Sequence, residues 1–260
     1  MVESIREIGF RSLVVVAQLG RILRFAGAIV RSTFAPPYRL QRHLEELYNL
    51  GVLSLIIVCI SGLAVGMVLG LQGYNTLVRF GAEGSLGAVV GLSLIRELGP
   101  VLSALLVTGR AGSATAAEIA SMVTSEQLDG LRMMSIDPLR FVVSPKAVAM
   151  VVVMPMLNAL FILCGIGGAY LIGVPLMGLD GGVFASSLTS SVRFSDDIVG
   201  SLLKAVVFGA LMGLIATFRG YFSAPTAAGV SAATTSTVVI TSVAILIGDY
   251  FLTALWGIEP

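Results

Sequence analysis

Residues 49–78 read NLGVLSLIIVCISGLAVGMVLGLQGYNTLV, a stretch that contains no charged side chain. A helix needs about 20 apolar residues to cross the hydrocarbon core of a bilayer, which is roughly 30 Å thick. The stretch is longer than this requirement, so tilt or an extension past the membrane surface must absorb the surplus. We therefore predict that it forms a transmembrane helix, and the number of similar stretches decides the fold.

Four further apolar runs are long enough to cross a bilayer: residues 86–109, 147–173, 198–218 and 230–256. The chain of 260 residues is 56% hydrophobic and only 12% charged, whereas soluble domains contain roughly 25% charged residues. These values predict an all-α integral membrane protein with about five transmembrane helices. We assign the five helices to one membrane domain over residues 46–260.

The N-terminal segment, residues 1–45, differs from the spans because arginines recur among its apolar residues: Arg6, Arg11, Arg21, Arg24 and Arg31. They interrupt any continuous apolar core, so the segment lacks the pattern of a cleavable signal peptide. Apolar residues recur between the arginines at roughly helical spacing, which is typical of a basic amphipathic helix lying at the membrane interface. Packing on a partner protein is the alternative interpretation of the same pattern.

Basic residues are distributed unevenly between the loops, and this asymmetry predicts the orientation of the chain. They are concentrated before the first span and between the second and third spans, whereas the opposite loops hold only Arg79 and Arg193. Because loops rich in arginine and lysine stay in the cytoplasm, we predict a cytoplasmic N-terminus and a C-terminus outside. The loop over residues 173–197 is then expected to be an external polar connection.

Four charged side chains lie inside the predicted spans: Arg96, Glu97, Lys204 and Asp249. Such residues are rare in lipid because each one costs about 2.5–3.5 kcal/mol at a helix centre. Their distances from the ends of the spans place all four in the outer half of the membrane. We interpret them as mutually neutralising charges that line a cavity open to the outside. Buried ion pairs that only fix helix packing are the alternative.

The carboxylates of Glu97 and Asp249 also permit a different mechanism, because intramembrane acids can bind protons or cations. The chain would then be an ion-coupled secondary transporter that is driven by the membrane potential. The residues alone leave this alternative open.

The first span carries two helical patterns of its own. Steps of three and four residues place one apolar face toward its outer end: Leu69, Gly73, Leu77 and Phe80. This face could hold acyl chains, and contact with bulk lipid or with a neighbouring helix is the alternative. Earlier in the span, glycines at every fourth position form a ridge of small residues: Gly62, Gly66 and Gly70. Such a ridge allows close approach of a second helix, within the chain or across a homodimer.

The segment between the second and third spans, residues 118–140, is predicted to contain a short amphipathic helix on the cytoplasmic side. Ser125 has the position of a helix start, and Asp137-Pro138 ends the helix. Its apolar residues lie between these limits: Leu128, Leu131, Met133 and Met134. We expect this helix to dock a partner, and a position on the membrane surface is the alternative.

Motifs for catalysis and for nucleotide binding are missing from the sequence. It contains no GxxxxGK[ST] phosphate loop, no GxSxG elbow and no HExxH helix. Cys59 and Cys164 lie inside apolar runs and His43 is the sole histidine, so we expect no metal site. The net charge of +1 gives no reason to expect nucleic acid. We predict that the chain is not an enzyme and has no cofactor, so any ATP hydrolysis requires a separate subunit.

Several motifs resemble the MlaE family, the permease subunits of ABC transporters associated with maintenance of outer-membrane lipid asymmetry. The motifs are SGLAVGMVLGLQGY at residues 61–74, LIRELGPVLSALLVTGRAGSATAAEI at 94–119 and EQLDGLRMMSIDPLR at 126–140. A shorter match is PTAAGVSAATTSTVV at residues 225–239. The resemblance covers the chain from about Leu47 to the C-terminus.

The resemblance implies a homodimeric permease for glycerophospholipid in the Gram-negative inner membrane, with five transmembrane helices in each subunit and a periplasmic C-terminus. It also implies cytoplasmic ABC ATPase subunits that bind ATP and magnesium, and a STAS-domain regulatory subunit. On the periplasmic side it implies a hexamer of MCE-domain subunits and a soluble lipid carrier.

The resemblance also assigns roles to residues. Arg96, Glu97, Lys204 and Asp249 match polar positions of the family's lipid cavity. We expect these residues to contact the lipid together with the apolar face of the first span: Leu69, Leu77 and Phe80. The segment that would seat in the ATPase as a coupling helix contains six residues of interest: Glu126, Gln127, Leu128, Leu131, Met133 and Asp137.

Overall fold

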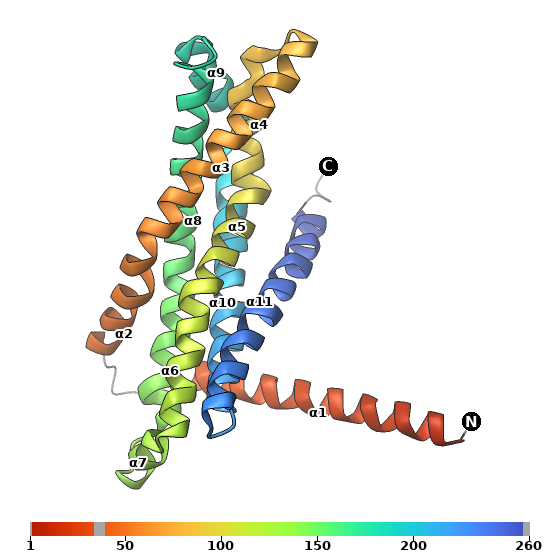
Figure 1. The fold of residues 1–260 in the computed structure, drawn as a ribbon, viewed down its shortest axis with the longest axis vertical. Helices are drawn as coiled ribbons and strands as arrows, with labels where there is room; N and C mark the ends of the chain where they lie inside the picture. Colours follow the sequence, from red (N-terminus) through yellow and green to blue (C-terminus); the bar gives the residue numbers. More distant parts are fainter. Residues whose placement is uncertain (1, 34–39, 257–260) are drawn as a thin grey trace.

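The computed structural model describes the backbone of residues 2–33 and 40–256 and the side chains of residues 17–33 and 41–255. These residues are almost entirely helical and contain no β-strand. The helices form an elongated bundle, and α1 (Val2–Thr33) projects from its lower end at a steep angle (Figure 1). The all-α fold that the sequence predicts is therefore confirmed.

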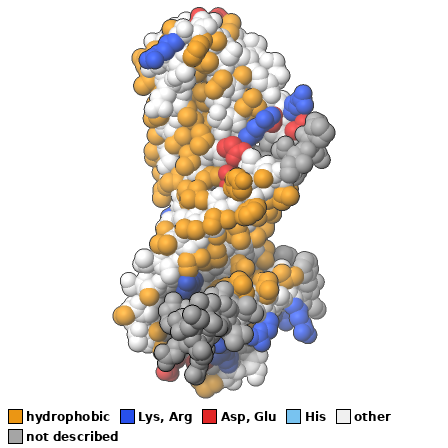
Figure 2. Space-filling model, turned by 90° about the vertical axis from the view of Figure 1, so that its right-hand side faces the viewer, with side chains coloured by type: hydrophobic (Ala, Val, Ile, Leu, Met, Phe, Trp, Pro, Cys, Tyr) orange, Lys and Arg blue, Asp and Glu red, His pale blue; other side chains and the backbone are white. Residues whose placement is uncertain are grey.

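Five long helical stretches are apolar enough to cross a membrane: Gln41–Phe80, Glu83–Thr124, Leu139–Gly173, Phe194–Tyr221 and Ala227–Leu255. Each of them overlaps one of the predicted spans, and the second continues well past the predicted end at residue 109, to Thr124. Hydrophobic side chains cover the middle of the molecule on the face drawn in Figure 2, whereas charged side chains lie near its two ends and on its upper flank. The described part of the chain thus contains the five membrane-crossing helices that the apolar runs predict.

Most spans are built from more than one helical element. The first comprises α2 (Leu40–Leu47), η1 (Tyr48–Val52), α3 (Leu53–Leu77) and η2 (Val78–Phe80). The second comprises η3 (Glu83–Ser85), α4 (Leu86–Ser93), η4 (Leu94–Leu98), α5 (Gly99–Val107), η5 (Thr108–Gly112) and α6 (Ser113–Thr124). The last three comprise η6 (Leu139–Val143) with α8 (Ser144–Gly173), η7 (Phe194–Ile198) with α10 (Val199–Tyr221), and α11 (Ala227–Trp256).

The elements η1, η4, η5, η6 and η7 are single π-helical turns, which the sequence pattern did not predict. A π turn interrupts the regular α-helical hydrogen bonding, and such turns are frequent at functional sites. Arg110 in η5 donates from Nη1 to the carbonyl oxygen of Asn49 in η1 at 3.0 Å and to Oγ of Ser54 at 2.8 Å. The π turns of neighbouring spans are therefore held together by a side chain that uses backbone carbonyls as acceptors.

The glycine ridge of the first span packs against α8 of the same chain. Gly62 faces the backbone of Phe161, and Gly66 faces the backbone of Gly165 so closely that a Cβ atom at Gly66 would overlap its carbonyl group. Gly70 lies against Ala169, whose Cα would be 2.9 Å from an added Cβ. The ridge therefore serves close packing within the chain, and these faces are covered rather than available as a homodimer seam.

The connection over residues 173–197 is not simply a polar loop, because it contains α9 (Gly181–Ser191). Asp180 caps this helix, since its Oδ1 accepts a hydrogen bond from the amide of Val183 at 2.9 Å. Phe184 is buried and its ring meets that of Tyr170 edge-on, with 5.6 Å between centroids. The sequence prediction was incomplete here because a single buried aromatic residue gives no clear helical periodicity.

Some of the side chains that the structure describes in α1 pack against the bundle, and the others are exposed. Phe25 and Ile29 are buried, and the Phe25 ring lies 5.5 Å from that of Phe218 and 5.6 Å from that of Tyr221. The arginines of this part of the helix are exposed: Arg21, Arg24 and Arg31. The C-terminal half of α1 is thus anchored to α10, while its position at a membrane surface stays a prediction. Arg6 and Arg11 lie outside the described side chains.

Candidate functional site

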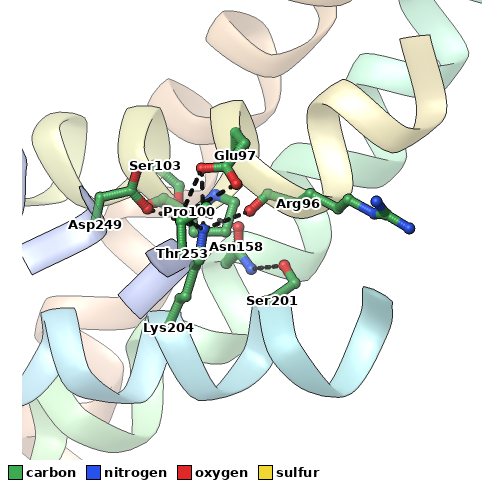
Figure 3. Close-up of polar contacts among 9 residues, drawn as sticks. All are labelled: Arg96, Glu97, Pro100, Ser103, Asn158, Ser201, Lys204, Asp249 and Thr253. Atoms are coloured by element: carbon green, nitrogen blue, oxygen red, sulfur yellow. Dashed lines mark hydrogen bonds and ion pairs between the residues drawn. The ribbon is translucent and has the colours of Figure 1, made fainter. Parts of the chain in front are cut away.

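The side chain of Lys204 is the centre of a polar cluster inside the bundle. It projects from α10, is 10% exposed, and its Nζ lies 3.0 Å from Oε2 of Glu97 and 3.1 Å from Oδ1 of Asp249. Nζ also donates to Oγ1 of Thr253 at 2.7 Å. In Figure 3, Glu97 from the second span and Asp249 and Thr253 from α11 all point towards Lys204. Three of the four predicted intramembrane charges therefore meet in one place.

The fourth predicted charge, Arg96, contributes its backbone to the cluster and not its side chain. Its carbonyl oxygen accepts a hydrogen bond from Nζ of Lys204 at 2.8 Å, while its guanidinium extends away from the lysine (Figure 3). Arg96 and Glu97 both lie in the π turn η4, whose irregular backbone places this carbonyl beside the ammonium group. One π turn thus presents a carbonyl oxygen and a carboxylate to the same cation.

The Arg96 side chain pairs instead with Asp197, which the sequence analysis had placed in an external polar loop. Nε of Arg96 lies 2.6 Å from Oδ1 of Asp197, whose side chain is only 2% exposed. Asp197 also accepts a hydrogen bond from the amide of Arg193 at 2.7 Å. The interpretation that the four span charges neutralise one another therefore holds for Lys204, Glu97 and Asp249. It does not hold for the side chain of Arg96, because the carboxylate that pairs with it comes from η7.

The exposed parts of the cluster are an acid and a base that are neighbours in sequence. The Glu97 side chain is 43% exposed and that of Arg96 is 54% exposed, whereas Lys204 and Asp249 are largely covered. If all groups are ionised, the acids Glu97, Asp249 and Asp197 outnumber the bases Lys204 and Arg96. The accessible groups are therefore one guanidinium and one carboxylate that come from the same π turn and point in different directions (Figure 3), while the small excess of negative charge belongs to the covered groups.

A second polar network lies next to the cluster and was missed by the sequence analysis. Asn158 on α8 is completely buried, and its Nδ2 donates to Oγ of Ser201 on α10 at 3.0 Å (Figure 3). Oδ1 of Asn158 accepts from Ser103 on α5 at 3.4 Å. A buried amide must be paired in this way, so the network fixes the relative positions of three spans around Lys204. An asparagine inside an apolar run was the sequence signal for it.

The apolar residues predicted for acyl chains do not share one environment. Leu69 and Leu77 are half-buried and pack against the core of the bundle, whereas Phe80 in η2 is 79% exposed. A separate apolar groove of about 360 Å³ lies between α3, α5 and α8, with Ser61, Leu105 and Phe161 among its lining residues. Its lining includes none of the residues of the Lys204 cluster. The structure thus offers an exposed aromatic ring at the C-terminal end of the first span and a separate open groove nearer the middle of that span.

The predicted cytoplasmic helix is α7 (Gln127–Met133), which lies at the lower tip of the molecule in Figure 1. Leu128 is buried against Ile119 and Val142, and Leu131 is half-buried in the same cluster. Their side chains therefore hold α7 to the bundle and are not free to contact a partner in this arrangement. Met133, in contrast, is 84% exposed and lies outside this buried cluster.

The polar residues of α7 and its flanks also divide by environment. Glu126 and Gln127 are exposed, and Glu126 has a positive φ of 56° as the chain turns out of α6. Asp137 is exposed, and its Oδ1 accepts from the amide of Leu139 at 3.0 Å, where η6 begins. Arg132 donates to the hydroxyl of Tyr221 at 2.7 Å. The exposed surface of the tip therefore consists of Glu126, Gln127, Met133 and neighbouring residues.

Metal binding has no support among the residues that the structure describes. No group of three or more His, Cys, Asp or Glu side chains there is arranged to hold a metal ion.

Comparison with known proteins gives consistent matches over nearly the whole chain. The family model described as Permease MlaE matches residues 43–255. The chain is 48% identical over 239 residues to the intermembrane phospholipid transport system permease protein MlaE of Haemophilus influenzae, which covers 90% of this chain and 92% of that protein. It is 39% identical to a probable ABC transporter permease protein of Rickettsia felis, over 96% of each chain. A more distant relative, at 32% identity over 89% of this chain and 66% of its own length, is the chloroplastic protein TRIGALACTOSYLDIACYLGLYCEROL 1 of Arabidopsis thaliana.

Proposed function

The chain belongs to the MlaE permease family, and from this premise we propose that it is the membrane-spanning subunit of an ABC transporter for glycerophospholipid. The transporter moves lipid between the inner membrane of a Gram-negative bacterium and periplasmic partners. The observation that carries the proposal is the Lys204 cluster with the neighbouring Arg96 side chain, which together present accessible charges of both signs within membrane-spanning helices. Intramembrane charges are costly and usually mark a substrate pathway.

The headgroup of the lipid is proposed to bind at Arg96 and Glu97. A guanidinium is well suited to phosphate, because its planar donors match the phosphate oxygens. The carboxylate of Glu97 accepts hydrogen bonds from an ammonium or hydroxyl group of the same headgroup. Lys204 is too well covered to reach the lipid easily, so its role is to hold Glu97 and Asp249 in place. This division of roles suits a headgroup that carries both a phosphate and a donor group.

The acyl chains are proposed to lie along the outer end of the first span. Phe80 is the most accessible apolar residue there, and Leu69 and Leu77 form the half-buried floor beside it. An apolar ring and aliphatic side chains provide the non-directional contacts that hydrocarbon chains need.

The energy is proposed to come from a separate ABC ATPase that binds ATP and magnesium and docks on α7. Met133 and Met134 are exposed there, and methionine adapts well to an apolar groove on a partner. ATP-driven closure of a homodimer of this chain would squeeze the outward cavity and shift the lipid towards the periplasmic partner. A STAS-domain subunit, an MCE-domain hexamer and a soluble lipid carrier belong to this proposal through the family resemblance.

The proposed orientation places α1 and α7 on the cytoplasmic side and the C-terminus in the periplasm. Support comes from the exposed arginines of α1 and from Arg132 and Arg140 near α7, which gather at the same end of the bundle. The Lys204 cluster then lies in the periplasmic half of the membrane.

A reconstitution assay tests the proposal against the ion-coupled alternative. The permease and its ATPase partner are incorporated into vesicles that contain labelled phospholipid, and transfer to an acceptor is measured with ATP and with an ionophore. Lipid transfer that depends on ATP and is unaffected by the ionophore supports the ABC permease. Transfer that needs no ATP and stops with the ionophore would assign the carboxylates of Glu97 and Asp249 to ion coupling and contradict the proposal.

A further inference from the structure

The other lysine of the chain, Lys146, lies at the opposite end of the bundle and is even more deeply buried than Lys204. Its side chain is 4% exposed, and its Nζ lies 2.9 Å from Glu46 and 2.8 Å from Oε2 of Glu118. The Glu46 side chain is 15% exposed and that of Glu118 is 51% exposed. One ammonium group is therefore held between two carboxylates that come from different helices.

These three residues join the elements that surround α7. Glu118 lies on α6, which leads into α7, and Lys146 lies on α8, which follows it. The ion pair between them closes the base of the loop that carries α7. Glu46 lies on α2, which continues through η1 into the first span. The triad thus connects α6 and α8, the helices before and after α7, to the first span, which bears Leu69 and Leu77.

Two further contacts make this junction stiff. Leu128 of α7 is buried against Ile119 of α6 and Val142 of η6, so α7 packs on the helical elements that precede and follow it. Ser144, close to Lys146 in α8, shares a hydrogen bond of 2.7 Å with Thr33 at the end of α1. This bond ties α8 to α1. The route from α7 to the start of the first span runs through the packing of Leu128 on α6 and then through the Lys146 triad to α2.

We propose that Lys146 is a positioning residue that makes α2, α6 and α8 move as one unit, so that motion of an ATPase docked on α7 reaches the first span. This inference rests on the proposed function. The two arms of the triad differ in strength, because a largely buried pair such as Lys146 with Glu46 is costly to break, whereas the half-exposed Glu118 is screened by solvent. The Glu46 arm fixes α8 to α2, and the Glu118 arm is the one that can be removed without unfolding the chain.

The test measures lipid transferred for each ATP hydrolysed by the permease and ATPase complex in vesicles. Glu118→Gln removes the α6 arm and leaves Lys146 neutralised by Glu46. Glu45→Gln is the matched control, because Glu45 is exposed on the same helix as Glu46 and lies 3.6 Å from the exposed Arg42. Lys146→Arg keeps the positive charge, and Lys146→Met removes it.

The expected result for Glu118→Gln is ATP hydrolysis within about twofold of the unmodified complex and lipid transfer per ATP reduced about fivefold or more. Glu45→Gln leaves the ratio unchanged, and Lys146→Arg retains more coupling than Lys146→Met. If the ion pair between Glu118 and Lys146 only stabilises the fold, Glu118→Gln lowers the thermal stability and reduces ATP hydrolysis and lipid transfer in proportion. An unchanged ratio of lipid transferred to ATP hydrolysed in Glu118→Gln would overturn the inference. If the unmodified complex shows no ATP-dependent transfer at all, the proposed function fails and takes this inference with it.

Discussion

Lys204 donates a hydrogen bond of 2.8 Å to the backbone carbonyl oxygen of Arg96, although the side chain of Arg96 is itself a cation. The two positive charges avoid each other because the guanidinium turns away to Asp197. The π turn η4 makes this possible, since it directs the carbonyl to one side of the second span and the long side chain to the other. Arg96 therefore meets two different charges, the covered ammonium of Lys204 through its carbonyl oxygen and the carboxylate of Asp197 through its side chain.

Removal of the Lys204 charge is expected to destabilise the protein strongly. Lys204→Met leaves Glu97 and Asp249 without their shared cation, and loss of one partner of a buried ion pair costs about 3–5 kcal/mol. Thermal unfolding in detergent measures the effect. The double variant Lys204→Met with Asp249→Asn should recover part of the loss, because it removes one of the two uncompensated carboxylates. Equal stability of the single and double variants would argue against the ion pair as the cause.

The buried acid Asp197 is expected to matter much more than its exposed neighbour Asp196. Asp197→Asn weakens the charge-assisted bonds from Arg96 and from the Arg193 amide, and a hydrogen bond to a charged group contributes about 1.5–3 kcal/mol. Asp196 is the matched control, since its side chain is 54% exposed and lies 3.8 Å from Arg193. Asp196→Asn should change the unfolding temperature little. Similar shifts for the two variants would contradict the assigned role of Asp197.

A methyl group at Gly66 is expected to separate α3 from α8. The added Cβ would overlap the carbonyl group of Gly165, which is backbone and cannot rotate away. Overpacking of this kind costs about 1–3 kcal/mol. Gly167→Ala on α8 is the control, because no atom lies within 4 Å of its added Cβ. Chemical denaturation or thermal unfolding should show a loss for Gly66→Ala only, and a tolerant Gly66 would mean that the helices have room to shift.

Substitution of the exposed Met133 is expected to weaken docking of the ATPase without unfolding the permease. Met133→Asp places a charge where an apolar contact is proposed, and loss of a central apolar contact lowers affinity about tenfold or more. Met133→Leu keeps an apolar side chain and should bind normally. Co-purification of the ATPase, together with the unfolding temperature of the permease, separates the two effects.

Leu128→Asp serves as the contrasting variant, because its side chain is buried against Ile119 and Val142. It should lower the stability of the α7 region as well as ATPase binding. If Met133→Asp co-purifies with normal amounts of ATPase, the docking surface lies elsewhere on the tip.

The membrane spans could be predicted from sequence because their signal is local and strong. A run without charges over residues 49–78 has few alternatives to a transmembrane helix, and the five spans of the structure follow the five apolar runs. The π turns had no such signal, since nothing in the sequence LIREL of η4 shows where the α-helical hydrogen bonding is interrupted. The existence of α9 was also missed, because its length of 11 residues and one buried side chain give no clear period.

The candidate site could be predicted in composition but not in pairing. Lys204, Glu97 and Asp249 can be identified because they are charged residues inside apolar runs, where an unpaired charge is costly. The partner of Arg96 could not be read from the sequence, because Asp197 lies about a hundred positions away and outside the predicted span. Amphipathicity likewise identifies the apolar face of α7, but it does not tell whether Leu128 is covered by Ile119 of the same chain or by a partner.

Lys146 and Lys204 are the lysines of this chain, and both ammonium groups are engaged in ion clusters at opposite ends of the bundle. Their side chains are 4% and 10% exposed, so an amine-reactive acylating reagent finds almost no accessible side-chain amine in the folded protein. Each lysine becomes reactive only when its own cluster opens. Mass spectrometry of the two lysine peptides, taken during turnover of the complex, would therefore time the opening of each end separately, with the protein's native residues as the reporters.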